Sequence, residues 1–578
     1  MKNPFEYETA KNLTVNEILD YYEPHFNYSR FLESKRNIFL LGERGSGKTM
    51  ALLYSSFKIK YQDPKRNKDE DLFEKVAVHI PCITPLFHKR EYLLLDNDYK
   101  AQISAEHYFV LSIAYELTDS LKDLEEVKEA FKDLDKEFKE DFEYIFSIEL
   151  NKKLSFLDAV NKWVIKENIN TQIQANDTKN DEFYSRALTM STLLIPLMNK
   201  IKKAKILKNT HFIFLIDDAQ DLNIHQVKVL NSWIAYRDHS DFSIKVATAK
   251  VNKPRRITTT GGAILEGHDF TTIDLEKPFY NKDSEFSNLA KSIVKRRLKK
   301  INNLDCEPEA FFPTNPDLEK GIENFKEVAK KEGEKKYGES EKKKVTDHIY
   351  KYGRAYYFRS RSAKANLPPY SGFDTIIDVS TGIVRNLLDP CYYMFDFMIS
   401  STKGKKNISS IPPKTQKQIL IERSDAMWKR LQEGLENEIE TCSLDQSKMV
   451  YKLFDNLMIL FHSRLMRHKS EPRAIMFTIS QQNHERYDEL LELLKIAQLA
   501  QVLYTRQGNA KDDGRKETYY VPNRILLPTR GLDPKGQHAR VSIKCSDLWN
   551  AASNNIKIPY NDNDGDEEDQ DIQVELFG

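Results

Sequence analysis

Short apolar runs recur along the first half of the chain, separated by longer stretches in which apolar residues follow a helical spacing. The runs cover residues 37–41, 76–80, 211–216, 242–248 and 270–275. Continuous apolar runs of this length are typical of strands that are buried on both faces, and helices between them supply the crossovers that parallel strands need. The pattern therefore predicts an α/β fold built on a five-stranded parallel sheet.

The second and third runs are separated by about 130 residues, most of them with helical periodicity. A single crossover between parallel strands needs far fewer residues than this. We therefore expect a helical insertion at about residues 83–205, inside a sheet domain that spans residues 1–280.

The second half of the chain is mostly helical by periodicity. Residues 281–405 predict a helical lid with a charged insertion at about 318–347, and residues 406–467 predict a helical linker. Within residues 468–555 a strand, a helix and a two-stranded hairpin follow one another, which is the order of a winged helix. The acidic residues 556–578 predict a disordered tail.

Charge and composition exclude several classes of protein. The 88 lysine and arginine residues balance 87 aspartate and glutamate residues, so no overall field would gather nucleic acid or anionic lipid. No apolar run approaches the ~18 residues that a membrane helix needs, and the polar N-terminus lacks a secretory apolar region. The five cysteines are widely spaced, unlike the short pairs of zinc and redox motifs. We therefore expect a cytoplasmic protein that does not enter membranes.

A glycine-rich loop follows the first predicted strand and precedes helix-forming residues. Its sequence fits the pattern G-x-x-x-x-G-K-[ST] at every fixed position. In this setting backbone N–H groups and the amino end of the helix bind phosphates, the lysine reaches the terminal phosphates, and the Ser/Thr hydroxyl binds Mg²⁺. The residues expected to bind the nucleotide are Gly42, Glu43, Arg44, Gly45, Ser46, Gly47, Lys48, Thr49 and Met50. Lys48 is also expected to act on the transferred phosphoryl group.

The third apolar run ends in Asp217 and Asp218. A carboxylate at the end of a buried strand beside a phosphate loop is placed to hold Mg²⁺, so we expect Thr49 and Asp217 to bind the metal. Asp218 occupies the position of the general base that polarises the attacking water. Its side chain is one methylene shorter than glutamate, so we expect slow or stimulated hydrolysis. An acidic pair that only caps a turn is the alternative.

The phosphate loop, the Asp-Asp strand, residues 246–248 and the segment Ser380-Thr-Gly-Ile-Val-Arg385, which is expected on a later helix, together resemble the origin-recognition-complex-like AAA+ ATPases. They also resemble the related signal-transducing STAND NTPases. The resemblance covers about residues 3–398 and implies ATP and Mg²⁺ as cofactors. It implies that Thr248 is a polar sensor near the γ-phosphate, although asparagine is commoner there. It also implies that Arg385, on a helix of the lid, contacts the γ-phosphate and contributes to catalysis. An ordinary surface arginine is the alternative for Arg385.

Several basic residues are candidates for contacts with other molecules. By the same resemblance, Arg255 or Arg256 would be an arginine finger for a neighbouring subunit, and a basic surface loop is an equally good interpretation. Residues 350–364 interleave aromatic and basic side chains, a pattern that serves either single-strand binding or the packing of a small lid.

The winged-helix region carries 15 basic and 10 acidic side chains between residues 464 and 550, a balance that mildly favours DNA contact. Its predicted recognition helix is acidic and would be repelled by phosphates. DNA would therefore have to be bound by residues around that helix, namely Lys511, Arg515, Lys516, Arg464 and Arg467. Docking of a protein on the winged helix is the alternative.

The sequence thus predicts a Mg²⁺-dependent AAA+ or STAND-like ATPase that works as a switch or an assembly machine. We expect self-association and a separate effector protein, because the sequence shows no nuclease, protease, deaminase or reductase motif. The resemblance implies a mobile-element or anti-phage defence setting. The first alternative is an ATP-controlled DNA-binding initiator or loader, and the second is a scaffold that binds nucleotide without hydrolysing it.

Overall fold

The chain forms two compact units, which are described separately. The sheet unit comprises Glu8–Lys277, and the C-terminal unit comprises Met1–Tyr7 together with Pro278–Gly578. The structure is a computed structural model. It describes residues 3–6, 9–24, 29–64, 71–82, 97–176, 187–236, 241–251, 255–275, 285–301, 304–362, 367–401, 408–467, 472–509, 516–536 and 540–560.

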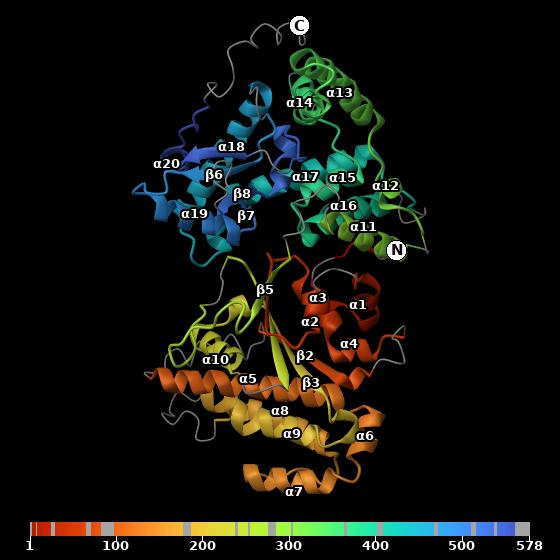
Figure 1. Ribbon diagram of the computed structural model, residues 1–578, viewed down its shortest axis with the longest axis vertical. Helices are drawn as coiled ribbons and strands as arrows, with labels where there is room; N and C mark the ends of the chain where they lie inside the picture. The colour runs from red at the N-terminus through yellow and green to blue at the C-terminus, as the bar shows by residue number, and fades with distance from the viewer. Residues whose placement is uncertain are drawn as a thin grey trace. The chain divides into compact units, whose positions relative to one another are not determined.

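Five parallel strands form the centre of the sheet unit (Figure 1). They lie in the order β2-β3-β4-β1-β5. The predicted parallel sheet is confirmed, and each strand begins and ends within one residue of its predicted bounds. The strands are β1 (Ile38–Leu41), β2 (Lys75–Pro81), β3 (His211–Asp217), β4 (Phe242–Thr248) and β5 (Thr271–Asp274). Leu41 pairs with Thr248 and Pro81 pairs with Asp217, so the carboxyl ends of these strands share one edge.

Alternate residues of each strand pack into different cores. Ile213 and Leu215 of β3 join the core that contains Leu52 of α3, whereas Phe212 and Phe214 join the larger core on the other face. Both faces of the sheet are therefore covered by helices, which explains why β1 and β3 are apolar at successive positions instead of alternating.

The helices of the sheet unit fall into a leader, a layer beside the phosphate loop and a large insertion. The insertion between β2 and β3 runs from α5 to α9, and α5 packs against β2, α8 and α10 (Figure 1). The helices are α1 (Val15–Tyr21), α2 (Ser29–Leu32), α3 (Lys48–Ser55), α4 (Phe57–Tyr61), α5 (Asp98–Leu121), α6 (Glu125–Phe131), α7 (Asp135–Phe146), α8 (Phe156–Asn176), α9 (Ile195–Ile201) and α10 (Ile224–Ala235). Short helical turns are η1 (Ala10–Asn12), η2 (Leu72–Glu74), η4 (Met190–Leu194), η5 (Lys205–Leu207) and η6 (Ala219–Asp221).

The C-terminal unit begins with a set of helices. These are α11 (Glu285–Leu298), α12 (Pro308–Phe311), α13 (Pro316–Tyr337), α14 (Lys342–Ser362), α15 (Phe373–Val379), α16 (Val384–Ser401), α17 (Pro413–Glu433) and α18 (Leu444–Arg467). The charged segment near residues 318–347 forms parts of α13 and α14, which pack along each other as a hairpin (Figure 1). Gly321 and Gly353 allow this close approach, because a Cβ on either would meet the opposite helix at 2.5 Å or 2.8 Å.

A winged-helix domain completes the C-terminal unit. Its strand β6 (Met476–Ser480), helix α19 (Tyr487–Leu499) and hairpin of β7 (Leu503–Asn509) and β8 (Lys516–Pro522) follow the predicted order. A further strand, β9 (Arg540–Lys544), pairs in parallel with β6, and the sheet order is β7-β8-β6-β9. The sequence analysis did not predict β9. Helix α20 (Cys545–Asn554) then packs against α18. Of the predicted acidic tail, residues 561–578 lie outside the described residues.

The helices from α11 to α18 and the winged helix share one hydrophobic core. A buried ion cluster also joins them: Asp533, 2 % exposed, accepts hydrogen bonds from Arg354 Nε and Nη2 at 2.9 and 2.8 Å. Arg473 lies 3.6 Å from the same carboxylate. These contacts, together with the shared core, explain why both parts belong to one compact unit.

The start of the chain is bound into the C-terminal unit. Phe5 is fully buried among aromatic rings that include Phe311 and Phe395, and Arg297 Nη1 donates to the carbonyls of Pro4 and Glu6 at 2.6 and 2.9 Å. No helix within the described ranges is long and apolar enough to cross a membrane.

Candidate nucleotide site

The phosphate loop lies between β1 and α3, as the motif requires. Gly45 and Gly47 have positive φ values of 89° and 97°, which allow the loop to curl. A Cβ on Gly42 would meet Ser46 Oγ at 2.5 Å and Ser46 Cβ at 3.2 Å, so a larger residue there would crowd Ser46. The loop backbone can therefore approach a phosphate closely, and α3 begins at Lys48 with its amino end at the loop.

Lys48 is largely buried, and its ammonium group lies inside the loop. Its Nζ donates to the carbonyls of Gly42 and Glu43 at 2.8 and 3.1 Å. These two partners are neutral carbonyls of the loop itself and do not cancel the charge of Lys48, which a phosphate entering the loop would meet. Ser46 and Glu43 are also buried, whereas Arg44 is exposed and Met50 packs beside the core of α3.

Thr49 and Asp217 meet at the edge of the sheet. Thr49 Oγ1 donates to Asp217 Oδ1 at 3.2 Å, and His79 Nε2 lies 3.1 Å from Asp217 Oδ2. Burial alone would raise the pKa of this fully buried carboxyl, but the hydrogen bond and charge of His79, the Thr49 hydroxyl and Lys11 outweigh burial and lower its pKa. Asp217 is therefore an ionised oxygen donor next to a hydroxyl, which suits Mg²⁺.

Asp218 follows in a left-handed backbone conformation, with φ 59° and ψ 39°. Its Oδ2 lies 3.1 Å from Lys11 Nζ, and its Oδ1 accepts from Gln220 Nε2 at 3.3 Å. Gln220 Oε1 in turn accepts from the backbone N–H of Ala249 at 3.1 Å. The predicted base is thus placed beside Asp217, the predicted metal-binding carboxylate, and is held by two neighbouring side chains.

Thr248 ends β4 next to the loop, where its carbonyl accepts from Gly42 N at 3.3 Å. Its side chain is fully buried, and Oγ1 has no hydrogen-bond partner among the described residues. A buried hydroxyl without a partner is costly unless a ligand or water satisfies it. The glycine cradle, the Lys48 ammonium, the Thr49–Asp217 pair and this hydroxyl therefore fit a Mg²⁺-bound triphosphate.

Arg255 and Arg256 differ in what they contact. Arg256 lies over the ring of Phe270, 4.6 Å from its centroid, and 3.6 Å from Glu266. Arg255 is exposed, and the buried amide of Asn231 donates to its backbone carbonyl at 2.6 Å. Arg255 is therefore an exposed side chain on a backbone that Asn231 holds. Arg256 instead contacts Phe270 and Glu266 of its own chain, so Arg255 is the better placed of the two candidates for an arginine finger.

The expected helical placement of residues 380–385 is wrong in part. Only Val384 and Arg385 belong to α16, and residues 380–383 form a turn in which Thr381 and Gly382 have positive φ values of 57° and 79°. This turn contacts the winged helix: Thr381 Oγ1 accepts from Arg524 N at 3.0 Å, and Thr381 O accepts from Arg506 Nη2 at 3.1 Å. Arg385 is half-buried on the first turn of α16 in the C-terminal unit.

The candidate DNA contacts are scattered. Lys516 and Arg467 are exposed, Arg464 is 9 % exposed, and Lys511 and Arg515 lie outside the described residues. Helix α19 exposes Asp488, Glu489 and Glu492, as the sequence indicated. In the aromatic and basic segment 350–364, Arg354 binds Asp533 and the buried Arg359 donates to the carbonyl of Leu465. These two arginines stabilise the C-terminal unit from within.

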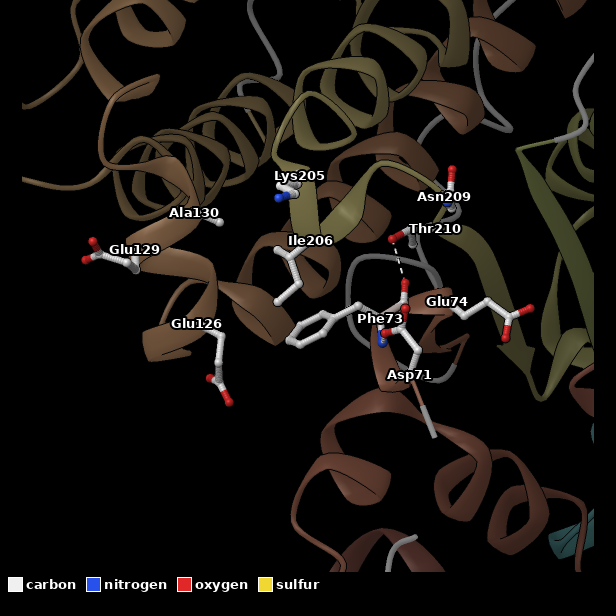
Figure 2. Close-up of a pocket in the computed structure, with 10 residues that line it drawn as sticks. All are labelled: Asp71, Phe73, Glu74, Glu126, Glu129, Ala130, Lys205, Ile206, Asn209 and Thr210. Atoms are coloured by element: carbon white, nitrogen blue, oxygen red, sulfur yellow. Dashed lines mark hydrogen bonds between the residues drawn. The ribbon is translucent and has the colours of Figure 1, made fainter. Parts of the chain in front are cut away.

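A separate hollow of about 610 Å³ lies at the opposite edge of the sheet, where Phe73 and Thr210 precede β2 and β3 (Figure 2). Phe73 and Ile206 point toward each other across it. The charged residues that line the hollow are Asp71, Glu74, Glu126, Glu129 and Lys205. Four carboxylates against one ammonium group would repel a polyphosphate, so the nucleotide is not expected there.

Two residues of the site were missed by sequence reasoning. His79 is two residues before the end of β2, and Lys11 belongs to the polar leader. The pairing of Pro81 with Asp217 brings His79 to the carboxylate, and a polar residue near the end of an apolar strand was the signal available for it. Lys11 gave no such signal, because its contact with Asp218 spans 207 residues.

Comparisons with known proteins extend these observations. The ORC-CDC6-like family matches residues 3–543. Among solved structures, the chain is similar to Cdc6p from Pyrobaculum aerophilum, with 11 % sequence identity, a TM-score of 0.28, and coverage of 91 % of this chain and 97 % of that one. A search of curated proteins found no match.

Proposed function

Because the chain belongs to the ORC-CDC6-like family, we propose that it binds ATP with Mg²⁺, hydrolyses it slowly, and uses the cycle as a conformational or assembly switch. The observation that carries this proposal is the meeting of the phosphate loop with Asp217: Thr49, two residues after Gly47 of the loop, has its Oγ1 3.2 Å from Asp217 Oδ1. These are the groups that a Mg²⁺-bound triphosphate requires at one place.

Each residue has a separate role in the proposed reaction. The loop N–H groups and Lys48 bind the phosphates, and Thr49 with Asp217 would hold Mg²⁺, which neutralises phosphate charge when bound. Asp218 accepts the proton of the attacking water. The water oxygen bonds to the γ-phosphorus while the bond to the ADP oxygen breaks, which yields ADP and phosphate. Thr248 would contact the γ-phosphate with its buried hydroxyl.

The C-terminal unit offers a route from nucleotide to partner. We propose that Arg385 contacts the γ-phosphate, by resemblance to lid arginines. The next residue, Asn386, donates from Nδ2 to Tyr504 Oη of β7 at 3.0 Å, and Thr381 is bonded to Arg524. A movement of α16 would therefore carry the winged helix with it. A partner protein bound to the winged helix would respond to that movement. In an assembly of several copies, Arg255 of one copy would act at the nucleotide of its neighbour.

DNA binding under ATP control is the second candidate function. Exposed Lys516 at the start of β8 and exposed Arg467 at the end of α18 favour it. The acidic surface of α19 favours the docking of a protein instead. We therefore place DNA second, and we place a defence setting with a separate effector as the biological context that the family resemblance suggests.

The experiment that tests the proposal combines ATP hydrolysis, ATP binding by calorimetry and mass photometry, with and without duplex or single-stranded DNA. We expect binding that requires Mg²⁺ for full affinity, slow turnover, and a change in mass distribution with ATP. Stimulation only by duplex DNA would favour the initiator or loader. Tight binding without turnover under every condition would favour the scaffold, and absence of binding would refute all three.

A further inference from the structure

The leader places a cation on the carboxylate that is proposed to act as the general base. Lys11 Nζ lies 3.1 Å from Asp218 Oδ2, and Gln220 Nε2 donates to Asp218 Oδ1 at 3.3 Å. Each carboxylate oxygen therefore already accepts from a nitrogen of this chain. A base must have a free oxygen within hydrogen-bond reach of the water whose proton it accepts.

Asp218 is held in a costly backbone conformation. Its φ of 59° lies in the left-handed region, which is unfavourable for residues other than glycine and less so for aspartate. Its backbone N–H donates to Asp217 Oδ1 at 3.0 Å, so the base and the metal-binding carboxylate are linked. Such a conformation persists only where the surroundings hold it, and here Lys11 and Gln220 do so.

The backbone around Lys11 is held in place within the sheet unit. Thr9 caps η1, Thr14 and Glu17 form a capping box at α1, and Ile18 of that helix is buried. An exposed ion pair is normally weak because two flexible side chains must be ordered. The ordered backbone of η1 and α1 fixes the point from which the Lys11 side chain reaches Asp218.

We propose that Lys11 is a positioning residue that restrains Asp218 in the nucleotide-free chain, and that turnover requires this ion pair to open. This inference rests on the proposed hydrolysis of ATP. With the pair closed, the ammonium group offsets the negative charge of the carboxylate and occupies one acceptor position of Oδ2, so Asp218 is a weaker base toward water.

The test compares Lys11→Met, Lys11→Arg and Lys35→Met in the full chain. Lys35 is exposed and has no ion pair within the described part of the chain, so its substitution controls for lost charge. At saturating ATP we expect Lys11→Met to raise kcat about two- to fivefold, the effect of an ion pair of this exposure. KM and the affinity for a fluorescent ATP analogue should stay within about twofold. Lys11→Arg and Lys35→Met should behave like the unmodified chain.

Two further measurements separate a restraint from a merely structural role. Added KCl screens the ion pair, so kcat of the unmodified chain should rise with salt, while that of Lys11→Met should not. Asp218→Asn should remove turnover in both backgrounds. Unchanged or lower kcat in Lys11→Met overturns the restraint, and a lower value together with weaker analogue binding would place Lys11 on the nucleotide. Absence of turnover in all variants, with nucleotide bound, would overturn the proposed hydrolysis as well.

Discussion

Lys48→Ala is expected to abolish ATP turnover and to weaken ATP binding by about tenfold or more. The Lys48 side chain is buried, and its ammonium group donates to the loop carbonyls of Gly42 and Glu43. A charge-assisted hydrogen bond to phosphate contributes about 1.5–3 kcal/mol, which corresponds to about 10- to 150-fold in affinity. Calorimetry for binding and phosphate release for turnover measure the two effects.

The matched control is Lys60→Ala. Lys60 lies on α4, the helix that follows α3, and pairs with the partly exposed Glu33 instead of with the loop. Both variants lose one positive charge from the same layer of the sheet unit, so the comparison controls for the loss of charge. Because only Lys48 lies in the phosphate loop, we expect only Lys48→Ala to lose affinity for ATP. The thermal transition of each nucleotide-free variant shows whether the fold is intact. Normal turnover by a folded Lys48→Ala variant would contradict the assignment of the site.

The sheet and the phosphate loop could be predicted because their signals are local. β1 and most of β2 and β3 are continuous apolar runs, and these runs end where Gly42, Pro81 and Asp217 follow. In a parallel sheet the carboxyl ends of all strands lie at one edge, so the end of β3 at Asp217 and the loop after β1 lie at the same edge. Thr49 and Asp217 therefore followed from motif and topology, and the structure brings them to 3.2 Å.

The remaining parts of the site depend on contacts that leave no local pattern. Lys11 lies in a polar leader whose sequence has no feature that marks one lysine as functional. Its contact with Asp218 depends on how η1 and α1 pack. Thr381 was expected on a helix because its neighbours are helix-compatible, but hydrogen bonds from Arg506 and Arg524 stabilise a left-handed turn instead. Strand β9 likewise forms because β6 offers a free edge for parallel pairing.

The buried arginines show the same limit for charge patterns. Arg354 lies in a segment whose aromatic and basic alternation is compatible with nucleic-acid binding. The structure uses it for an ion pair with Asp533, 179 residues away along the chain. The sequence shows that Arg354 is charged but does not show which residue it pairs with. Whether an arginine side chain is exposed to a ligand or buried in an ion pair can therefore be assigned only after the fold is known.

Asp533→Ala is expected to destabilise the C-terminal unit by about 3–5 kcal/mol, the cost of breaking a buried ion pair by removing one partner. Asp533 is almost wholly buried and faces both Arg354 and Arg473, so the variant leaves two guanidinium groups without their carboxylate. Urea unfolding should show a lower midpoint. Hydrogen exchange should become faster in the C-terminal unit, while the amides of β3 in the sheet unit remain protected.

The control is Asp389→Ala, which breaks a bidentate pair with Arg423 at 2.9 and 3.0 Å. The geometry matches that of Asp533 with Arg354, but the Asp389 side chain is 21 % exposed against 1 % for Asp533. Solvent screens the control pair, so its loss should cost about 1 kcal/mol or less. Equal losses in the two variants would show that burial of the Asp533 cluster does not determine the stability of this unit.

The pH dependence gives an independent check. Burial alone would raise the pKa of Asp533, but the charges and hydrogen bonds of Arg354, with Arg473, outweigh it and hold the pKa below the ordinary value of 3.8. A carboxyl whose pKa is lowered in the folded state stabilises that state fully above its unfolded value and loses the contribution as pH falls through the folded value. The stability difference between the unmodified chain and Asp533→Ala should therefore be constant above about pH 5 and shrink below 3.8. A difference that grows on acidification would mean that Asp533 is protonated in the folded chain and that the two arginines are satisfied by other groups.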